Sequence, residues 1–152
     1  MIKRYGATPR RGQQYKLRPG AYAILPRKGQ LLLTWQDDPH FELQLPGGGI
    51  DPGETPVQAL HREVMEETGW RIARPRRLGA FRRFTYMPEY GFHAEKLCII
   101  YLAQPVRPQR APTETGHTAI WSEPEFAIDA LYNQGDAEFV ARFTQAAKLR
   151  VQ

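Results

Sequence analysis

The stretch GGIDPGETPVQALHREVMEETGW, which runs from Gly48 to Trp70, gathers acidic side chains in an otherwise basic chain. It holds five acidic residues and one basic residue, whereas the whole chain of 152 residues has 21 Lys and Arg against 16 Asp and Glu. A cluster of acidic residues in an otherwise basic protein attracts both cations and polyanions. Metal-assisted chemistry on phosphates requires this combination. An acidic, solvated helix face is the alternative that the charge counts leave open.

Signals for a helix are strongest in this same stretch. Thr55 is the predicted N-cap, Pro56 suits the first helical position, and Gln58 completes a capping box. Gly69 can end the helix in the left-handed conformation. The apolar residues that recur at helical spacing and would face the core are Val57, Leu60 and Val64. An amphipathic helix is therefore predicted between Thr55 and Gly69.

Three glutamates of this predicted helix share one face. Glu63, Glu66 and Glu67 project within about 100° of one another, because residues three and four apart are neighbours on a helix surface. Like charges at this spacing destabilise a helix by roughly a few tenths of a kcal/mol per pair, and Arg62 is the only Lys or Arg on the helix. A divalent cation would relieve the repulsion, and an all-oxygen ligand set favours Mg²⁺, Mn²⁺ or Ca²⁺ over zinc or copper.

The segment before the helix supplies further groups. Three consecutive glycines, Gly47–Gly49, are expected to form a loop whose backbone can approach a ligand closely. Flexible glycine backbone beside the start of a helix also suits phosphate oxygens. Glu54 approaches the same place from the turn that precedes the helix. Metal and phosphate are therefore expected to meet beside this helix.

Composition indicates one soluble globular domain. The chain has 41% hydrophobic and 24% charged residues, and we expect residues 1–152 to form a single domain with a basic N-terminal arm over residues 1–19. No apolar run approaches the roughly 20 residues that span a bilayer, and the N-terminus lacks the apolar core of a secretory signal. The one cysteine, Cys98, lies in the apolar run KLCIIYL and is expected to be buried. A cytoplasmic location fits these features best.

Short apolar runs bounded by turn residues predict strands in the rest of the chain. A β-hairpin is expected over residues 21–36 around the turn PRKG, followed by a short strand in FELQLP. Two strands are predicted around the loop MPEYGF, in RLGAFRRFTY and in HAEKLCIIYLA. A surface loop is predicted in QPVRPQRAPTETG, and a last strand in HTAIW. Ser122 and Glu125 have the spacing of a capping box for a helix over residues 123–132, and a final amphipathic helix is expected over residues 136–148. This mixture predicts an α+β fold or an α/β/α sandwich.

The acidic stretch resembles the Nudix box, which reads Gly, five residues, Glu, seven residues, and then Arg-Glu-aliphatic-any-Glu-Glu-any-Gly-aliphatic. The matching positions follow one another without a gap, and they are Gly48, Glu54, Arg62, Glu63, Val64, Glu66, Glu67 and Gly69. Only Trp70 departs, as an aromatic residue where an aliphatic one is usual. We expect this departure to change the packing behind the helix without touching the chemistry. The flanking pattern extends the similarity over most of residues 20–148.

The resemblance implies an α/β/α sandwich with a mixed central β-sheet, and hydrolysis of a nucleoside diphosphate linked to another moiety with Mg²⁺ or Mn²⁺. Carried over by position, the metal ligands are Glu63, Glu66 and Glu67, with the Gly47 carbonyl as a further candidate. Glu54 is expected to support the site. Arg62 is expected to orient a glutamate through a charge-assisted hydrogen bond.

The general base of such enzymes varies between a box glutamate and a carboxylate on a distant loop or strand. The distant candidates here are Glu89, Glu95 and Glu114. Glu95 is preferred because it lies on or beside the second mid-chain strand. Its alternative interpretation is an exposed strand glutamate next to Lys96.

Substrate choice is made outside the box, and three hypotheses follow. The first substrate class is a free nucleotide: a nucleoside triphosphate, a dinucleoside polyphosphate or a nucleotide-sugar. The second is the 5′ end of RNA, which the basic frame motivates. The third is a non-catalytic nucleotide sensor, which the complete set of box glutamates disfavours. Six arginines between Arg71 and Arg83 either grip extra phosphates or are solvated edge charges. No membrane partner is expected, and the protein is expected to be a monomer or a homodimer.

Overall fold

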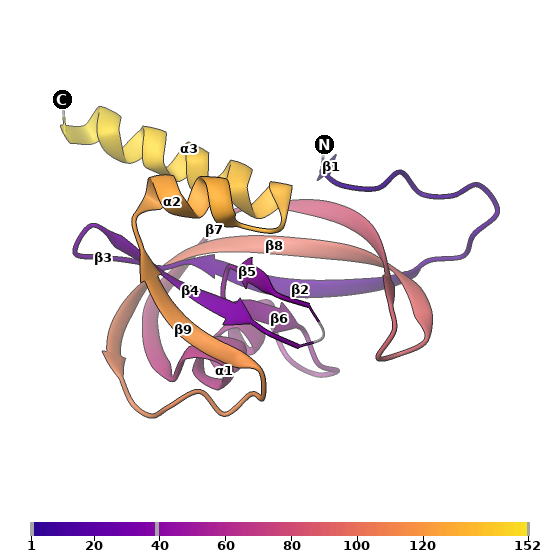
Figure 1. Cartoon of the computed structure of the whole chain (residues 1–152), viewed down its shortest axis with the longest axis horizontal. Helices are drawn as coiled ribbons and strands as arrows, with labels where there is room; N and C mark the ends of the chain where they lie inside the picture. Colours follow the sequence, from indigo (N-terminus) through magenta and orange to yellow (C-terminus); the bar gives the residue numbers. More distant parts are fainter. Residues whose placement is uncertain (1, 39, 152) are drawn as a thin grey trace.

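The computed structural model describes residues 2–38 and 40–151. The elements in chain order are β1 (Lys3–Arg4), β2 (Lys16–Ile24), β3 (Pro26–Arg27), β4 (Gln30–Gln36), β5 (Glu42–Gln44), β6 (Gly47–Gly49), α1 (Pro56–Thr68), β7 (Trp70–Met87), β8 (Phe92–Pro108), β9 (His117–Ser122), α2 (Pro124–Ala130) and α3 (Gln134–Val151). Strands β7, β8 and β2 cross the middle of the molecule, with α1 on one side of them and α2 and α3 on the other (Figure 1).

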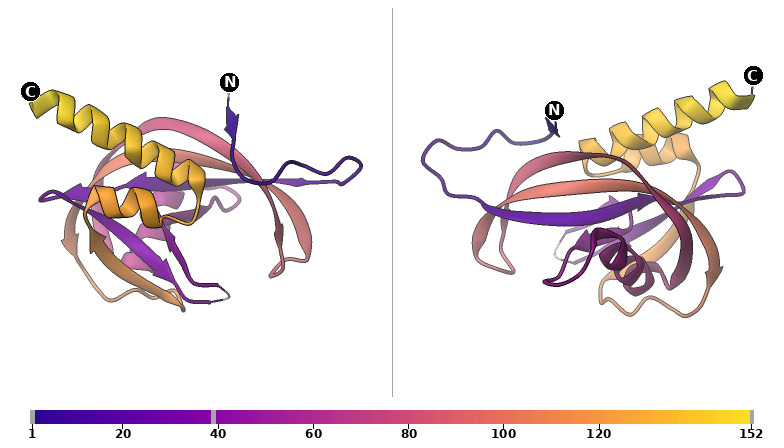
Figure 2. Two further views of the ribbon diagram at one scale, coloured as in Figure 1. Left: turned by 45° about the horizontal axis from the view of Figure 1, so that its top comes forward. Right: turned by 180° about the vertical axis from the view of Figure 1, so that it is seen from behind.

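Two β-sheets form the centre of the fold. The larger sheet has the strand order β1-β7-β8-β2-β6, in which β2 runs parallel to β8 and antiparallel to β6. The smaller sheet is built on β4, which pairs antiparallel with β3, β5 and β9. Figure 2 shows the long β7–β8 hairpin curving across the sheet, with its tip projecting from the body. A mixed sheet with helices on both sides confirms the predicted α/β/α architecture.

Each side of the larger sheet carries its own apolar core. Leu60 and Val64 of α1 are fully buried in one of these cores. Phe139 and Val140 of α3 are buried in the other, and Phe143 packs against them. Because fully burying an aliphatic side chain contributes about 1.5–3 kcal/mol, these contacts hold both helices firmly on the sheet. The polar face of α1 is thereby fixed in direction.

The predicted hairpin over residues 21–36 is partly wrong. The turn exists, but it joins the short strand β3 to β4, with Lys28 and Gly29 both at positive φ. Strand β2 pairs with β8 and β6 in the other sheet instead. Ala21, Ala23 and Ile24 are all buried, so this run is apolar on both faces of its strand. Such a pattern predicts a buried strand but does not identify its partners.

Three further boundaries differ from expectation. The glycines 47–49 form strand β6 rather than a loop, because their backbone pairs antiparallel with β2. Strand β8 continues to Pro108, into the expected surface loop, since Pro105 and its neighbours pair with the start of β7. Ser122 does not cap α2; its hydroxyl donates to the Glu123 carbonyl, and Glu123 occupies the N-cap position without a side-chain bond.

The predicted N-terminal arm contacts the larger sheet. Lys3 and Arg4 pair in parallel with Phe81 and Arg82 of β7, and β2 begins at Lys16. The single-domain assignment and the arm boundary at residue 19 stay predictions. Within the described part of the chain, no helix combines the length and the apolar character needed to cross a bilayer.

Candidate active site

Helix α1 holds the acidic stretch in the conformation that its capping residues predict. The Thr55 side chain accepts a bond from the Gln58 N–H (3.1 Å), and the Gln58 side chain accepts one from the Thr55 N–H (2.9 Å). Gly69 ends the helix in the left-handed region at φ 75°. Trp70 packs edge-on against Trp121, with ring centroids 5.2 Å apart. The aromatic departure from the box therefore acts through packing.

We call the three glutamates Glu63, Glu66 and Glu67 of α1 the carboxylate wall, and two of them, Glu63 and Glu67, line a cleft. Their side chains are 14%, 35% and 6% exposed respectively. Because the buried side chains of Leu60 and Val64 lie on the adjacent stripe of α1, the helix cannot rotate the wall away from the cleft without losing core burial. The wall therefore extends from solvent into the interior, with Glu67 deepest.

The glycines of β6 lie against this wall because they lack side chains. The Gly47 N–H donates to a Glu67 carboxylate oxygen at 2.9 Å. Gly47 has φ 148°, and a Cβ there would overlap the Ala21 carbonyl oxygen. A Cβ on Gly48 would lie 2.7 Å from both carboxylate oxygens of Glu63. The glycine run thus sets the wall in place, while a metal-ligand role for the Gly47 carbonyl stays a prediction.

Arg62 ties the wall to the turn before the helix. Its Nε and Nη2 donate to the two carboxylate oxygens of Glu54, both at 2.8 Å. Nη2 also donates to the Gly49 carbonyl at 3.0 Å. Nη1 reaches Glu63 at 3.0 Å and Glu66 at 3.4 Å. One guanidinium therefore orients two wall glutamates, and Glu54 serves as its anchor.

Burial shifts the pKa values of two wall glutamates, Glu63 and Glu67. Removal from water raises the pKa of Glu63 to about 7, although Arg62 opposes the shift. Burial also raises the pKa of Glu67 well above its usual range, although the hydrogen bond donated by the Gly47 N–H acts to lower it. Hydrogen bonds from Arg62 instead lower the pKa of Glu54 to about 2. A cation that binds the wall must therefore displace protons that burial retains.

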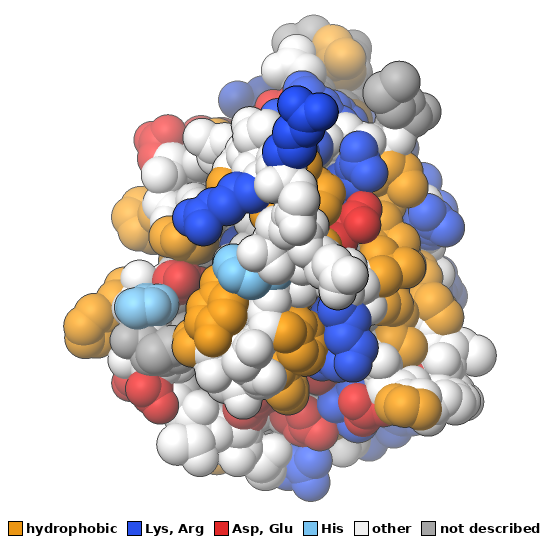
Figure 3. Space-filling view, turned by 90° about the vertical axis from the view of Figure 1, so that its right-hand side faces the viewer, with side chains coloured by type: hydrophobic (Ala, Val, Ile, Leu, Met, Phe, Trp, Pro, Cys, Tyr) orange, Lys and Arg blue, Asp and Glu red, His pale blue; other side chains and the backbone are white. Residues whose placement is uncertain are grey.

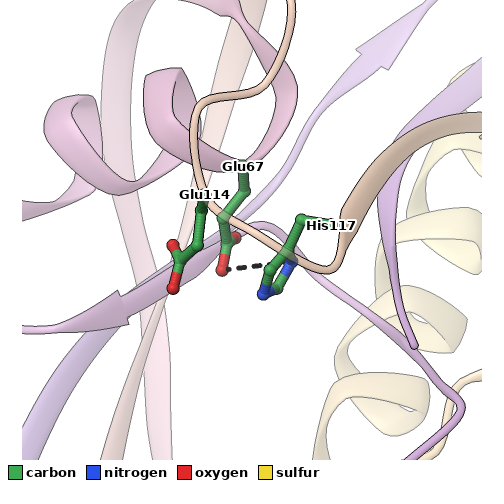
Figure 4. Close-up of side chains that lie close together, drawn as sticks. All are labelled: Glu67, Glu114 and His117. Atoms are coloured by element: carbon green, nitrogen blue, oxygen red, sulfur yellow. Dashed lines mark ion pairs between the residues drawn. The ribbon is translucent and has the colours of Figure 1, made fainter. Parts of the chain in front are cut away.

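Glu114, in the loop before β9, and His117, the first residue of β9, lie beside the wall (Figure 4). The Glu114 N–H donates to the Glu66 carbonyl oxygen (2.9 Å), which pins the loop against the end of α1. His117 places Nδ1 3.6 Å from a Glu67 carboxylate oxygen and 2.9 Å from the Thr34 hydroxyl. Burial lowers the pKa of His117, so its ring is neutral at pH 7 and a nitrogen lone pair is available.

Two groups of side chains are arranged to hold a metal ion, and they share Glu114. Glu63, Glu66 and Glu114 form one group, and Glu67, Glu114 and His117 form the other. Within each group the ligand atoms all lie within 4.8 Å of one another. The three carboxylates of the first group suit Mg²⁺ or Mn²⁺, whereas the imidazole of the second group is a ligand type that transition metals prefer. The structure thus divides the three predicted ligands between two groups, and their roles as ligands stay predictions.

Glu95, the preferred distant base, lies on the face of β8 that points away from the cleft. Its carboxylate pairs with Arg82 at 3.3 Å. The next residue, Lys96, lines the cleft, and successive side chains of a strand point to opposite faces. Glu89 lines the cleft from its exposed hairpin tip, whereas Glu114 lies among the wall carboxylates. Geometry therefore favours Glu114 over Glu95 for proton transfer, because a base must be within hydrogen-bond reach of the water.

A cleft of about 380 Å³ joins the wall to a second charged cluster. We call Arg83 of β7 and Lys96 of β8 the cationic floor; Cys98 and Asp136 line the cleft with them. Burial raises the pKa of Asp136 to about 7 and lowers that of Lys96. Cys98 is buried as predicted, and burial raises the pKa of its thiol to about 12, so the thiol is un-ionised at neutral pH.

Several cleft residues escaped sequence reasoning. His117 was identified only as the start of the strand HTAIW, far along the chain from Glu67. No spacing rule connects these two, because the pairing of β9 with β4 places the histidine. Of the six arginines between Arg71 and Arg83, only Arg83 is among the described residues that line the cleft. No motif or spacing in the sequence marked Lys96 or Asp136 as a cleft residue.

Comparison with known proteins places this geometry in a family. Residues 15–143 match the NUDIX domain family. The chain is 38% identical over 72 residues to a Bacillus subtilis (strain 168) protein with the provisional name 8-oxo-dGTP diphosphatase, a match that covers 46% of this chain and 47% of the relative. It is 42% identical over 59 residues to the RNA pyrophosphohydrolase of Helicobacter pylori (strain G27), covering 36% and 38% respectively. These matches span less than half the length of either curated relative.

Solved structures share the fold over most of the chain. The NUDIX hydrolase from Nitrosomonas europaea has a TM-score of 0.71 at 20% identity, and the match covers 86% of this chain and 90% of that one. The MutT protein from Methanosarcina mazei Go1 has a TM-score of 0.69 at 22% identity, covering 89% and 98%. At these identities the likeness concerns the fold.

Proposed function

This chain belongs to the NUDIX domain family, and we propose that it is a Mg²⁺- or Mn²⁺-dependent pyrophosphohydrolase. Its substrate would be a nucleoside diphosphate linked to another moiety, cleaved by attack of water on phosphorus. The observation that carries the proposal is the pair of ligand groups that share Glu114 at one side of a cleft. Anionic ligand groups facing a cleft of about 380 Å³ suit a metal and a nucleotide together.

The wall glutamates would hold the metal, with the Glu114 carboxylate beside them. A divalent ion bound there would neutralise charge on the phosphoryl oxygens and lower the pKa of a water molecule. Arg62 keeps Glu63 and Glu66 directed at that position, and the Gly47 amide does the same for Glu67. Orientation by these groups is in place before substrate binds, which reduces the reorganisation that the reaction needs.

Glu114 is the carboxylate that we assign as proton acceptor. It belongs to both ligand groups and lies on a loop that is pinned to α1 by its own backbone. His117 is neutral and close to Glu67, so it can accept a proton passed on from this cluster. Glu95 is the competing base, and its pairing with Arg82 on the opposite face of β8 argues against it.

The 5′ end of RNA is the second candidate substrate. Relatives named as RNA pyrophosphohydrolases favour it, and the Arg18 guanidinium lies 4.8 Å above the Tyr90 ring where both residues line the cleft. A basic groove longer than one nucleotide would support it further. The end of the molecule shown in Figure 3 instead interleaves acidic and basic side chains. A free nucleotide is therefore the leading candidate.

The proposal is tested with a panel of substrates and resolved products. Purified protein would be incubated with a nucleoside triphosphate, a dinucleoside polyphosphate, a nucleotide-sugar and 5′-triphosphorylated RNA, each with Mg²⁺, with Mn²⁺ and with excess chelator. We expect metal-dependent hydrolysis of at least one compound and none in chelator. Reaction in ¹⁸O-labelled water would identify the phosphorus attacked. Full activity in chelator, or no hydrolysis of any compound, would contradict the proposal.

A further inference from the structure

The cationic floor crowds two positive charges on the cleft side of the larger sheet. Arg83 and Lys96 are direct partners across the antiparallel strands β7 and β8. Both line the cleft, so both side chains project from the same face of the pair. Like charges directly opposite each other destabilise a sheet. The register therefore places an unfavourable pair where a hydrophobic or oppositely charged pair would be more stable.

No ion pair offsets this crowding among the described residues. Neither Arg83 nor Lys96 has a carboxylate oxygen within 4.0 Å, although other surface cations of the chain do. The Nε of Arg83 is buried and has no hydrogen-bond partner. A buried donor without a partner destabilises the folded protein, and such groups call for an explanation. A ligand that accepts hydrogen bonds supplies one.

Asp136 is the nearest counter-charge, and it balances the floor incompletely. The Asp136 side chain lies at the start of α3 and also lines the cleft. Burial raises its pKa to about 7, and even when ionised this one carboxylate offsets only one of the two cationic groups. Glu89 also lines the cleft but is exposed to solvent at the hairpin tip. The floor therefore retains a net positive charge.

The floor is close enough to the carboxylate wall for one substrate to reach both. Tyr22 lies between them: it pairs with Gly47 across β2 and β6. Burial raises the pKa of the Tyr22 hydroxyl, and Arg83, Asp136 and Glu67 all act on it as neighbouring charges. The same side chain thus adjoins the floor and the deepest glutamate of the wall. A chain of linked phosphoryl groups could extend from one to the other past Tyr22.

We propose that Arg83 and Lys96 bind a phosphoryl group of the substrate other than the two joined by the cleaved anhydride. This inference rests on the proposed function. It narrows the substrate class to compounds with a third phosphoryl group, such as nucleoside triphosphates, dinucleoside polyphosphates or 5′-triphosphorylated RNA. Nucleotide-sugars, which carry two phosphoryl groups, would leave the floor without its ligand and would be poorer substrates.

The kinetic test compares floor variants on substrates with three and two phosphoryl groups. Lys96→Gln and Arg83→Gln are expected to lower kcat/KM about tenfold or more for a nucleoside triphosphate, because a charge-assisted hydrogen bond is lost. They should change kcat/KM for a nucleotide-sugar less than about twofold. Arg76→Gln, an exposed arginine of β7 away from the cleft, is the matched control. Arg83→Lys keeps the positive charge, and it replaces Arg83→Gln in this comparison if the glutamine variant does not fold. Equal losses on both substrates, or none on either, would overturn the proposal.

A binding test separates this proposal from the proposed function. Inorganic triphosphate would be titrated into the whole protein in excess chelator, with calorimetry as the readout. Binding is expected in the wild type, about tenfold weaker in Lys96→Gln, and retained in Glu67→Gln, which lacks the wall charge needed for hydrolysis. If the wild type hydrolyses nothing yet shows this pattern, the floor site stands and the proposed function fails. Binding that is insensitive to Lys96→Gln and Arg83→Lys would overturn the floor site even where hydrolysis is seen.

Discussion

The carboxylate wall and the cationic floor face one cleft, and both crowd like charges. In the wall, Arg62 contacts two of the glutamates and anchors itself on Glu54, so an opposite charge is built into the same short segment. In the floor, Arg83 and Lys96 have no such partner among the described residues, and Asp136 supplies one carboxyl beside two cationic groups. The wall is thus organised before anything binds, whereas the floor depends on its ligand for balance.

Like charges are brought together in two different ways in the wall and in the floor. Glu63, Glu66 and Glu67 lie together because of helical spacing, so their crowding is local. Arg83 and Lys96 lie together because of strand register, which the whole sheet sets. A change in the wall should therefore act on metal-dependent chemistry. A change in the floor should act on substrate choice and on the pH dependence of stability.

The largest expected effect comes from Glu67→Gln. The amide keeps the size of the side chain and an oxygen for the Gly47 N–H, so the fold should persist. It removes the deepest wall charge, and kcat/KM with Mg²⁺ should fall by more than about a hundredfold, beyond the loss typical of a supporting residue. Steady-state kinetics with thermal unfolding would measure both. Glu138→Gln, whose side chain is solvent-exposed on α3, is the control. A rate within about threefold of wild type for Glu67→Gln would remove Glu67 from the proposed ligand set.

Arg62→Lys tests whether the wall needs a guanidinium or only a positive charge. A lysine cannot bind both oxygens of Glu54 and also reach Glu63, because its single ammonium group lacks the planar fork. We expect a loss of about ten- to a hundredfold in activity, mainly as a higher Mg²⁺ requirement. Activity titrated with Mg²⁺ would show this. The control is Arg142→Lys, at a surface ion pair with Glu138, which should behave as wild type. An unchanged Mg²⁺ requirement in Arg62→Lys would mean that the positive charge alone is enough to orient the wall.

Gly48→Ala and Gly49→Ala form a matched pair for the backbone behind the wall. A methyl group on Gly48 would lie 2.7 Å from the Glu63 carboxylate oxygens, whereas one on Gly49 would meet only an Arg18 nitrogen at 3.9 Å. Displacing Glu63 should lower kcat/KM by about tenfold, since small misplacements of catalytic groups are costly. The Gly49 variant should remain close to wild type. Similar activities in the two variants would show that Glu63 does not need its observed position.

The smallest expected effect is on stability, through Asp136→Asn beside the floor. Burial raises the Asp136 pKa to about 7 in the folded protein, whereas in the unfolded chain it is ordinary. The folded state therefore holds the extra proton between roughly pH 4 and 7, and this group's contribution to stability declines as pH rises through that range. The asparagine variant cannot ionise, so its stability relative to wild type should increase from pH 5 to pH 8. Urea unfolding at both pH values measures this difference. A constant difference would mean that Asp136 does not titrate there.

Much of the fold and the carboxylate side of the cleft could be predicted before the structure. The caps at Thr55 and Gly69 and the shared face of the glutamates depend on residues a few positions apart. The pairing of β2 with β8 could not be predicted, because its run is buried on both faces and offers no alternation to choose a partner. Glu114 was only one of three candidate bases until its loop was seen to be bonded to the end of α1.

The sequence by itself determined helix α1, the orientation of its carboxylates and the chemistry that they favour, because caps and helical spacing act within one or two turns. Only the tertiary structure decided what stands opposite them. His117 reaches Glu67 through the pairing of β9 with β4, and Arg83 meets Lys96 through the register of β7 with β8. Asp136 joins that floor because α3 packs on the sheet. Such contacts arise from strand register and core packing, which are properties of the whole assembled fold rather than of any one segment.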